Sequence, residues 1–243
     1  MNINIESIRK ELETLSAYER VEWSVRTFGA HDIVLSSSLG LEDQVLTHMI
    51  LNVSKEARII TLDTGRNFQS TYDVMQETMN RYCFYYEIYF PDFRKIEEMA
   101  RTYGPNLFYE SVENRKLCCR IRKIEPLKRA LSTVKAWICG LRRDQSITRA
   151  EAGVIENDET FGIYKINPLY DWTGKEVWEY VKENGIPYNM LHDEGYESIG
   201  CEPCTRPICD GEDIRAGRWW WETPEKRECG LHVKTAGRND GQD

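Results

Sequence analysis

Closely spaced cysteines are the residues of this sequence whose types and spacing most clearly suit chemistry. Cys118 and Cys119 are adjacent, and Cys201 and Cys204 form a Cys-x-x-Cys pair. Because a zinc site or an iron–sulfur cluster takes about four soft ligands, neither pair completes a metal site alone. We therefore expect the four thiolates to meet at one centre. The residues leave zinc and iron open, although adjacent ligands suit a cluster of several irons better than one tetrahedral ion.

The other cysteines of the central part of the chain are expected to have simpler roles. The chain has eight cysteines, and such close spacings suit metal or redox work in a reducing compartment better than disulfides. Cys209 is an alternative metal ligand, because it follows the Cys-x-x-Cys pair closely. Cys83 and Cys139 lie in apolar runs, which predicts two small, buried side chains.

A lone thiol near the C-terminus, Cys229, is either a structural residue or a nucleophile whose partner is another molecule. The nearby cations Lys226, Arg227 and His232 favour the nucleophile, because a cationic neighbour lowers the pKa of a thiol and the thiolate is the reactive form. Three tryptophans at residues 219–221 are expected to pack or to anchor this tail.

Charge is distributed unevenly along the chain. The net charge of −8 argues against a general affinity for nucleic acid or anionic membranes. Residues 115–129 nevertheless carry seven Lys or Arg side chains against one Glu, and Arg215 and Arg218 are spaced like a clamp. A basic focus in an acidic protein fits a small, multiply charged anion as ligand, and a solvated helix face is the alternative.

The elements that must position these residues follow a regular order. After two N-terminal packing helices, short apolar runs alternate with helical periods, which predicts a parallel α/β sheet flanked by helices. The expected strands are residues 32–35, 58–62, 84–90, 136–141 and 161–166. The expected helices are residues 41–52, 69–82, 93–103, one that contains Cys118 and Cys119 and ends near Leu131, and one capped by Thr173 and Glu176.

Three loops follow expected strands, and ligands of open parallel sheets bind beyond the carboxyl ends of the strands. The loop at residues 36–40 offers serine hydroxyls and backbone N–H groups at a helix start, which suits an anion, although ordinary caps have the same composition. Asp63 ends a strand, where a carboxylate accepts ribose hydroxyls or makes a turn. The third loop, residues 140–149, carries three arginines.

Taken together and in order, these motifs resemble the assimilatory sulfonucleotide reductases, most closely the thioredoxin-dependent adenylyl-sulfate (APS) reductases. The resemblance covers the chain from about residue 33 to residue 232. The residues that carry it are Ser36-Ser37-Ser38-Leu39-Gly40-Leu41-Glu42-Asp43, Asp63-Thr64-Gly65, Cys118-Cys119 with Arg122-Lys123, Arg142-Arg143-Asp144-Gln145-Ser146, Cys201-x-x-Cys204, Arg215 with Arg218, and Glu228-Cys229-Gly230-Leu231-His232.

This resemblance implies the adenine-nucleotide α-hydrolase fold, which is related to the pyrophosphatase-loop ATPases. Those ATPases carry a Ser-Gly-Gly-x-Asp-Ser loop, whereas this chain has Ser-Ser-Ser-Leu-Gly at residues 36–40. The departure favours binding of a nucleotide over hydrolysis of ATP. The implied organisation is one reductase domain, residues 1–243, with N-terminal helices at 1–30, a nucleotide-binding α/β core at 31–190, and a cluster-completing, cysteine-rich segment with a mobile catalytic tail at 191–243.

The resemblance also implies a cofactor and a reaction. A [4Fe–4S] cluster is implied on the four paired cysteines, Cys118, Cys119, Cys201 and Cys204, with a positional and electrostatic role. Cys229 is implied to attack the sulfur of adenosine 5′-phosphosulfate and to form an S-sulfocysteine. Thioredoxin, or a glutaredoxin-like donor, would then release sulfite. The implied catalytic residues are Cys229, His232 and Lys123, and the implied substrate-binding residues are Ser36, Ser37, Ser38, Gly40, Asp63, Arg149, Arg215 and Arg218.

Several points stay open at this stage. The spacing in the loop at 140–149 does not decide among Arg142, Arg143 and Arg149 as the phosphosulfate contact. The complete cysteine set favours APS over the 3′-phosphorylated substrate (PAPS), whose reductases generally lack these cysteines, but dual use is not excluded. A homo-oligomer is compatible with the sequence.

Two rival functions come from other classes. A zinc-stapled nucleic-acid-binding module would use residues 115–129 and would leave Cys229 without a role. A transfer-RNA-modifying enzyme would require ATP consumption. No apolar run has the roughly 18 residues that a membrane span needs, and residues 1–13 do not resemble a signal peptide, so we expect a cytoplasmic protein without membrane contact.

Overall fold

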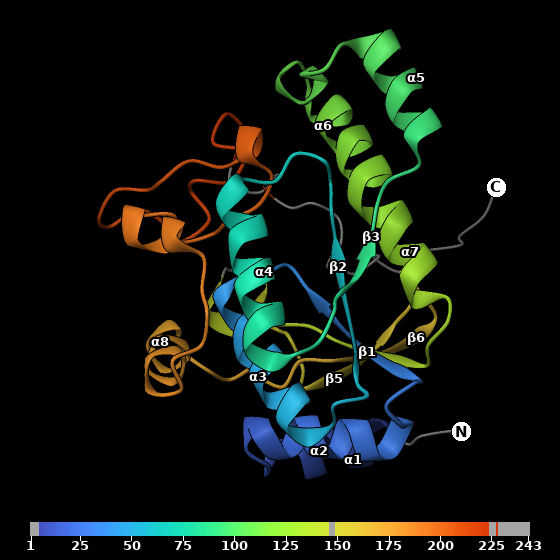
Figure 1. The fold of residues 1–243 in the computed structure, drawn as a ribbon, viewed down its shortest axis with the longest axis vertical. Coiled ribbons are helices and arrows are strands. Elements are labelled where there is room, and N and C mark those ends of the chain that lie inside the picture. Colours follow the sequence, from blue (N-terminus) through green and yellow to red (C-terminus); the bar gives the residue numbers. More distant parts are fainter. Residues whose placement is uncertain (1–4, 146–148, 224–226, 228–243) are drawn as a thin grey trace, which may run out of the picture.

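A single mixed sheet organises the computed structural model, which describes residues 5–145, 149–223 and 227 (Figure 1). The six strands lie in the order β3-β2-β1-β4-β6-β5. Every neighbouring pair is parallel except β5 with β6. The strand bounds are Ile33–Ser37 for β1, Arg58–Leu62 for β2, Glu87–Tyr89 for β3, Ala136–Ile138 for β4, Ile155–Asp158 for β5 and Ile163–Ile166 for β6. The predicted α/β sheet with flanking helices is therefore confirmed.

Helices cover the sheet, and α1 and α2 lie together at its lower end in Figure 1. Helices α4 and α5 have the predicted bounds, and the predicted capping box of Thr173 and Glu176 opens α8. None of the described helices is long and apolar enough to cross a membrane. The helix bounds are Ile5–Glu13 for α1, Ala17–Phe28 for α2, Leu41–Val53 for α3, Gln69–Tyr82 for α4, Phe93–Tyr103 for α5, Val112–Cys119 for α6, Glu125–Leu131 for α7 and Gly174–Glu183 for α8.

The core lies on both faces of the sheet. In β1, Ile33 and Leu35 belong to the cluster that contains α2 and α3, whereas Val34 belongs to the cluster that contains α7. All three side chains are fully buried. A strand buried on both faces reads as a continuous apolar run, which is the pattern that predicted it.

The strand ends differ from the prediction in ways that shape the site. Strand β4 ends at Ile138 instead of residue 141, and residues 139–142 line a cavity. Strand β5 was not predicted, since it is a short antiparallel addition at the sheet edge. The prediction for Cys83 was wrong: the residue is exposed and ends α4 in the left-handed region, at φ 56°. Cys139 is buried as predicted, and its thiol donates to Asn167 Oδ1 at 3.0 Å.

The helical run that carries the adjacent cysteines changes pitch directly after them. Helix α6 ends at Cys119, a π-helical turn spans Arg120–Ile124, and α7 follows. Pro126 stands in the first turn of α7, where its missing N–H removes one α-helical hydrogen bond. Such π-helical turns are frequent at functional sites, so the pitch change directs attention to the side chains around it.

The C-terminal segment returns to the top of the sheet and completes the site. Glu202 N–H donates to the carbonyl of Arg66 at 2.8 Å, which ties the Cys-x-x-Cys loop to the loop after β2. Trp219 N–H donates to the carbonyl of Cys204 at 3.2 Å. Cys201, Cys204 and Trp219 of this segment pack in one buried cluster with Cys118 and Cys119 at the end of α6. Figure 1 shows the segment as the orange and red ribbon near the top of α4.

Candidate active site

A cavity of about 420 Å³ opens where β1, β2 and β4 end. Its position beyond the carboxyl ends of parallel strands is where an open α/β sheet binds ligands, and its size suits a nucleotide. We call it the main cavity. Of the predicted substrate-binding residues, it is lined by Ser36, Ser37, Ser38, Gly40, Arg149, Arg215 and Arg218, and the predicted catalytic Lys123 also lines it.

The serine loop is held in place by Asp43. One carboxylate oxygen of Asp43 accepts both the N–H and the hydroxyl of Ser38, each at 2.6 Å, and the other accepts the N–H of Gly140 at 3.1 Å. Burial raises the pKa of the Asp43 carboxyl to about 6. A Cβ on Gly140 would lie 2.5 Å from Asp43 Oδ1, so only glycine allows this approach. Asp43 thus joins the ends of β1 and β4, a role that its place in the first helical turn did not reveal.

Asp63 lies outside the residues that line the main cavity. Its Oδ1 accepts the N–H of Gly65 at 2.8 Å and the hydroxyl of Tyr72 at 2.9 Å. The first of these bonds closes a turn after β2. Thr64, the next residue, lines the cavity in its place.

The arginines of the loop after β4 have different partners. Arg142 lines the main cavity, but its Nε donates to Glu42 Oε1 at 2.9 Å, so its charge is paired. Arg143 turns away: its Nε donates to the carbonyl of Ala152 at 2.8 Å. Arg149 lines the cavity and its guanidinium donates to Gln145 Oε1. The geometry therefore favours Arg149 over Arg143 as a contact for an anion.

Arg218 is a buried cation at the wall of the main cavity. The residue is 6 % exposed, and among the described residues no carboxylate lies within ion-pair distance of it. Its Nη1 donates a long bond of 3.3 Å to the carbonyl of Ile199, and its Nε is buried with no hydrogen-bond partner in the part of the chain that the structure describes. Arg218 also helps to lower the pKa of the Cys201 thiol, but with no carboxylate beside it this buried cation still favours an anion from outside the protein.

The four paired cysteines lie together next to the main cavity. Cys118, Cys119, Cys201 and Cys204 are all buried, share one cluster with Trp219, and line a second, smaller cavity of about 20 Å³. We call it the cysteine cavity. Trp219 also borders the main cavity, as do Cys201 and Lys123, so the two cavities share a wall. The alternative ligand Cys209 is exposed and does not line either one.

Basic side chains act on these thiols. Burial opposes ionisation of Cys201, but Lys123, a hydrogen bond with Thr64 and the nearby arginines together lower its pKa. The Thr64 hydroxyl lies 3.3 Å from Cys201 Sγ. Burial raises the pKa of Cys118, and burial together with Cys201 raises that of Cys204 to about 12.

The four thiols match a metal centre in their chemistry. Four soft thiols line one buried cavity, and the charge of one thiolate raises the pKa of its neighbours. This arrangement matches the chemistry of a four-thiolate cluster. Within the described ranges, no three His, Cys, Asp or Glu side chains are arranged closely enough to hold a metal ion. All four thiols nevertheless line the same cysteine cavity.

Trp219 and Arg115 form the buried floor beside the cysteines. Arg115 is fully buried and donates to both carboxylate oxygens of Glu222, at 2.9 and 2.6 Å. The guanidinium carbons of Arg115 and Arg218 lie 4.7 and 4.8 Å from the ring centroid of Trp219. Arg115 was predicted as part of a basic focus, but its charge is paired, and its partner is far away in the sequence.

The predicted catalytic residues Cys229 and His232 lie outside the described residues. The nearest described residue in the sequence is Arg227, which is bonded to Arg215 of the main cavity. Its carbonyl accepts a hydrogen bond from Arg215 Nη2 at 2.9 Å, and its own Nε donates to the carbonyl of Glu222 at 3.0 Å.

Comparisons with known proteins agree on one family. The family pattern described as "Phosphoadenosine phosphosulfate reductase domain" matches residues 32–207. A relative from Burkholderia cepacia named "Adenosine 5′-phosphosulfate reductase" is 48 % identical over 225 residues, which cover 92 % of this chain and 90 % of the relative. One of the same name from Allochromatium vinosum is 51 % identical over 200 residues, which cover 82 % and 78 %.

Solved structures show the same architecture. A phosphoadenylyl-sulfate (PAPS) reductase from Candida auris, in a phosphate complex, aligns with a TM-score of 0.73 at 34 % identity and covers 85 % of this chain and 98 % of that chain. An FMN adenylyltransferase from Candida glabrata aligns with a TM-score of 0.56 at 18 % identity, covering 91 % and 76 %, which reflects the shared fold alone.

Proposed function

The chain belongs to the phosphoadenosine phosphosulfate reductase domain family, and from this membership we propose that it reduces adenosine 5′-phosphosulfate to sulfite and AMP in sulfate assimilation. The observation that carries the proposal is the cation set of the main cavity. Lys123, Arg149, Arg215 and Arg218 line one nucleotide-sized space, and Arg218 has no carboxylate partner among the described residues. Such a space attracts a nucleotide with adjacent sulfate and phosphate groups.

In the proposed binding mode, the serine loop and the cations bind different parts of the ligand. The N–H and hydroxyl of Ser38 donate to Asp43, and the N–H of Leu39 donates to Ser37 Oγ. The Ser36 hydroxyl and the N-terminus of α3, which begins after Gly40, suit contacts with the polar groups of a nucleotide. The cations hold the phosphosulfate and stabilise the charge that develops on the departing phosphate. Asp43 positions the loop through Ser38 and has no direct contact with the ligand in this account.

The proposed reaction uses Cys229 as the nucleophile. Its thiolate attacks the sulfur of the substrate, the bond between that sulfur and the bridging oxygen breaks, and AMP leaves with the electron pair. Cys229 then carries a sulfonate on its sulfur. Support comes from Arg227, whose carbonyl accepts a hydrogen bond from Arg215, a residue that lines the main cavity. Two residues of extended chain reach about 7 Å, so the thiol has a short path to the cavity.

The second half of the proposed reaction needs a dithiol protein, for which thioredoxin is our candidate. One thiolate of the donor attacks Cys229 Sγ, and sulfite leaves with the electron pair of the S–S bond. The donor's second thiol resolves the mixed disulfide, which returns Cys229 as a thiol and leaves the donor oxidised. We assign His232 and Lys123 to charge stabilisation around Cys229 and the phosphosulfate.

We also propose that the four paired cysteines hold a [4Fe–4S] cluster. When bound, such a cluster supplies local charge and ties α6 to the C-terminal segment, whereas the thiol chemistry itself needs no electrons from it. Lys123 and Cys201 line both cavities, so their positions are linked to the cysteine site. A Cys201→Ser variant should lose iron and reductase activity together, and full activity without iron would remove the cluster from this account.

The substrate assignment is tested by comparing APS with PAPS. Relatives at 46 to 51 % identity are named for APS, and the PAPS reductase structure is 34 % identical. We expect anaerobically purified protein to release sulfite with a higher kcat/KM from APS than from PAPS in the presence of reduced thioredoxin. A preference for PAPS would overturn the assignment.

A further inference from the structure

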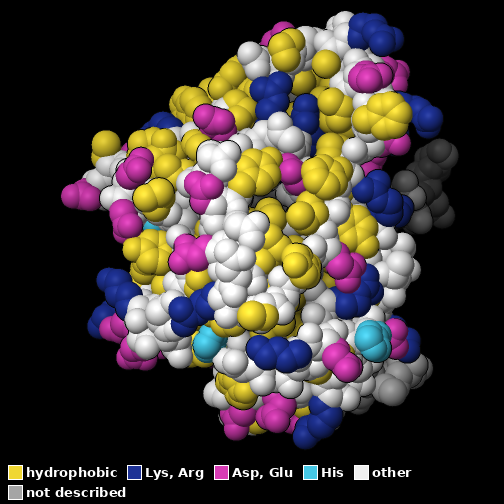
Figure 2. All heavy atoms as spheres, viewed as in Figure 1, with side chains coloured by type: hydrophobic (Ala, Val, Ile, Leu, Met, Phe, Trp, Pro, Cys, Tyr) yellow, Lys and Arg dark blue, Asp and Glu magenta, His cyan; other side chains and the backbone are white. Residues whose placement is uncertain are grey.

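An exposed group of aromatic side chains lies beside the place where the C-terminal tail begins. Tyr109 is 46 % exposed and Trp220 is 37 % exposed, although both are large and partly apolar. Trp221 lies next to both, with ring centroids 4.5 Å from Tyr109 and 4.7 Å from Trp220. We call Tyr109, Trp220 and Trp221 the aromatic ledge. Figure 2 shows that apolar side chains gather on the upper part of this face.

The ledge is held rigidly. The hydroxyl of Tyr109 donates to the carbonyl of Pro203 at 2.6 Å, which fixes the ring over the Cys-x-x-Cys loop. Phe108 supports it from below, edge to face, at 4.7 Å. Rigid aromatic residues lose little conformational entropy on binding and are enriched at the energetic centres of protein interfaces.

The side chain of Arg227, the last described residue, contacts the backbone next to the ledge. Arg227 donates through Nη2 to the carbonyl of Trp220 at 3.4 Å and through Nε to the carbonyl of Glu222 at 3.0 Å. Cys229 follows two residues later. A protein that must bring its own sulfur to Cys229 therefore has to contact the enzyme within about 7 Å of the Arg227 backbone, whose side chain contacts the Trp220 carbonyl.

We propose that the aromatic ledge is the docking surface for the dithiol protein that discharges Cys229. This inference rests on the proposed function. A redox protein that attacks a sulfur must expose its own thiol, and a flat apolar rim around that thiol would match the ledge. The buried Trp219 is not part of the surface, since it is 1 % exposed and lines the two cavities.

The test separates docking from chemistry. The holoenzyme is loaded with ³⁵S from labelled APS without a donor, and the release of labelled sulfite is then timed with reduced thioredoxin or with dithiothreitol. We expect Trp220→Ala to load normally and to be discharged by dithiothreitol at the wild-type rate. Discharge by dilute thioredoxin should slow about tenfold, as at an interface anchor.

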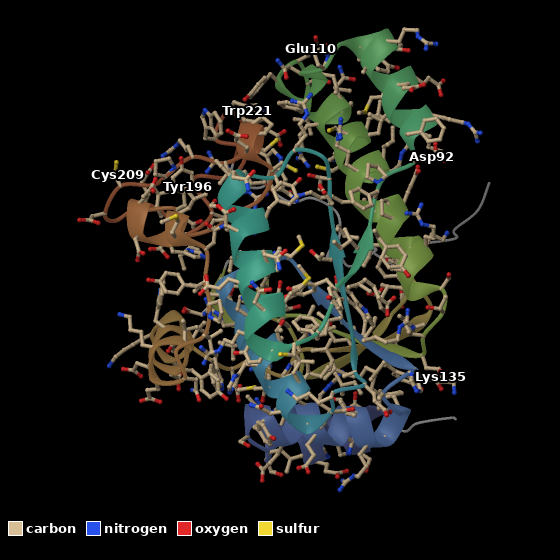
Figure 3. The ribbon with its side chains drawn as sticks, viewed as in Figure 1. Asp92, Glu110, Lys135, Tyr196, Cys209 and Trp221 are labelled. Carbon is tan, nitrogen blue, oxygen red and sulfur yellow. The ribbon has the colours of Figure 1, made fainter. Side chains whose placement is uncertain are left out.

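A matched control is Phe93→Ala. Phe93 is 63 % exposed, and it follows Asp92, which Figure 3 shows on the other side of α6 from Trp221. This variant should be discharged by thioredoxin at the wild-type rate. An unchanged thioredoxin rate in Trp220→Ala overturns the proposal. Equal slowing with both donors also overturns it and assigns the ledge to holding the tail. If the wild type takes up no label at all, the proposed function itself fails.

Discussion

Two buried arginines contact the same indole ring, Trp219, one from the main cavity and one from the cysteine cavity. In the cysteine cavity, Arg115 is paired with both carboxylate oxygens of Glu222. In the main cavity, Arg218 has no carboxylate partner within the described part of the chain. A buried cation needs a counter-charge. Arg115 has this counter-charge within the fold and so stabilises the fold, whereas Arg218 is placed to bind an anionic ligand.

The largest expected effect is the loss of stability when Arg115, the paired arginine, is replaced. Arg115→Met should lower the free energy of unfolding by about 3–5 kcal/mol, because it leaves the Glu222 carboxylate buried without its partner. Denaturant unfolding measures this change. The double variant Arg115→Met with Glu222→Leu should recover most of the loss, since no uncompensated charge remains. A double variant that is no more stable than the single variant would contradict the assigned role.

On the unpaired side, the expected loss is in ligand binding and catalysis. Arg218→Met should lower kcat/KM for APS about 10²–10³-fold, since it removes a preorganised cation from the phosphosulfate. Its free energy of unfolding should fall by much less than that of Arg115→Met. The matched control is Arg206→Met, because Arg206 pairs with Glu212 and lies outside both cavities. Equal stability losses in the Arg115 and Arg218 variants would contradict the different roles assigned to the two arginines.

A third buried charged residue, Asp43, is expected to make the stability of the protein depend on pH. Burial raises its pKa to about 6, above an unfolded value near 3.9. The folded chain therefore binds this proton more tightly, so the contribution of Asp43 to stability is full below about pH 4 and is lost as the pH rises through about 6. The difference in free energy of unfolding between wild type and Asp43→Asn should fall by up to about 3 kcal/mol between pH 4 and pH 7. A difference that does not vary with pH would contradict this.

The smallest expected effect comes from moving Arg218 without removing it. A Cβ at Gly200 would overlap the Arg218 guanidinium, so Gly200→Ala should displace the cation. We expect the affinity for AMP, measured by calorimetry, to fall about tenfold, which is about 1.4 kcal/mol. Gly153→Ala is the control, since its nearest non-neighbouring atom would lie at an ordinary 3.4 Å. Unchanged AMP affinity in Gly200→Ala would show that the exact place of Arg218 is unimportant.

The sequence predicted the elements whose patterns are local. The bounds of α4 and α5 follow from helical periodicity and from the turns around them, and β1 follows from an unbroken apolar run. Strand β5 carries no such signal, because Ile155–Asp158 is short, mostly polar and antiparallel at the sheet edge. Its existence depends on pairing with β6, which a local pattern does not encode.

In the candidate site too, features with a local sequence pattern were predicted, and contacts between distant residues were not. The serine loop and the cations were predicted from their position after strands and from the resemblance, and the main cavity brings them together. The bond from Gly140 to Asp43 and the ion pair of Arg115 with Glu222 join residues about a hundred positions apart. Asp63 was ambiguous in the sequence, and only its contact with Tyr72 and the turn at Gly65 showed where its carboxylate points.

The most direct test of the account is the transfer of ³⁵S from labelled APS to the anaerobically purified protein without a donor, followed by peptide mapping. We predict label on the Cys229 peptide that thioredoxin discharges as sulfite, and no label on a Cys229→Ser variant that still binds AMP. Label on another peptide, or a normal sulfite yield from Cys229→Ser, would contradict the assignment of Cys229 as the nucleophile served by the main cavity.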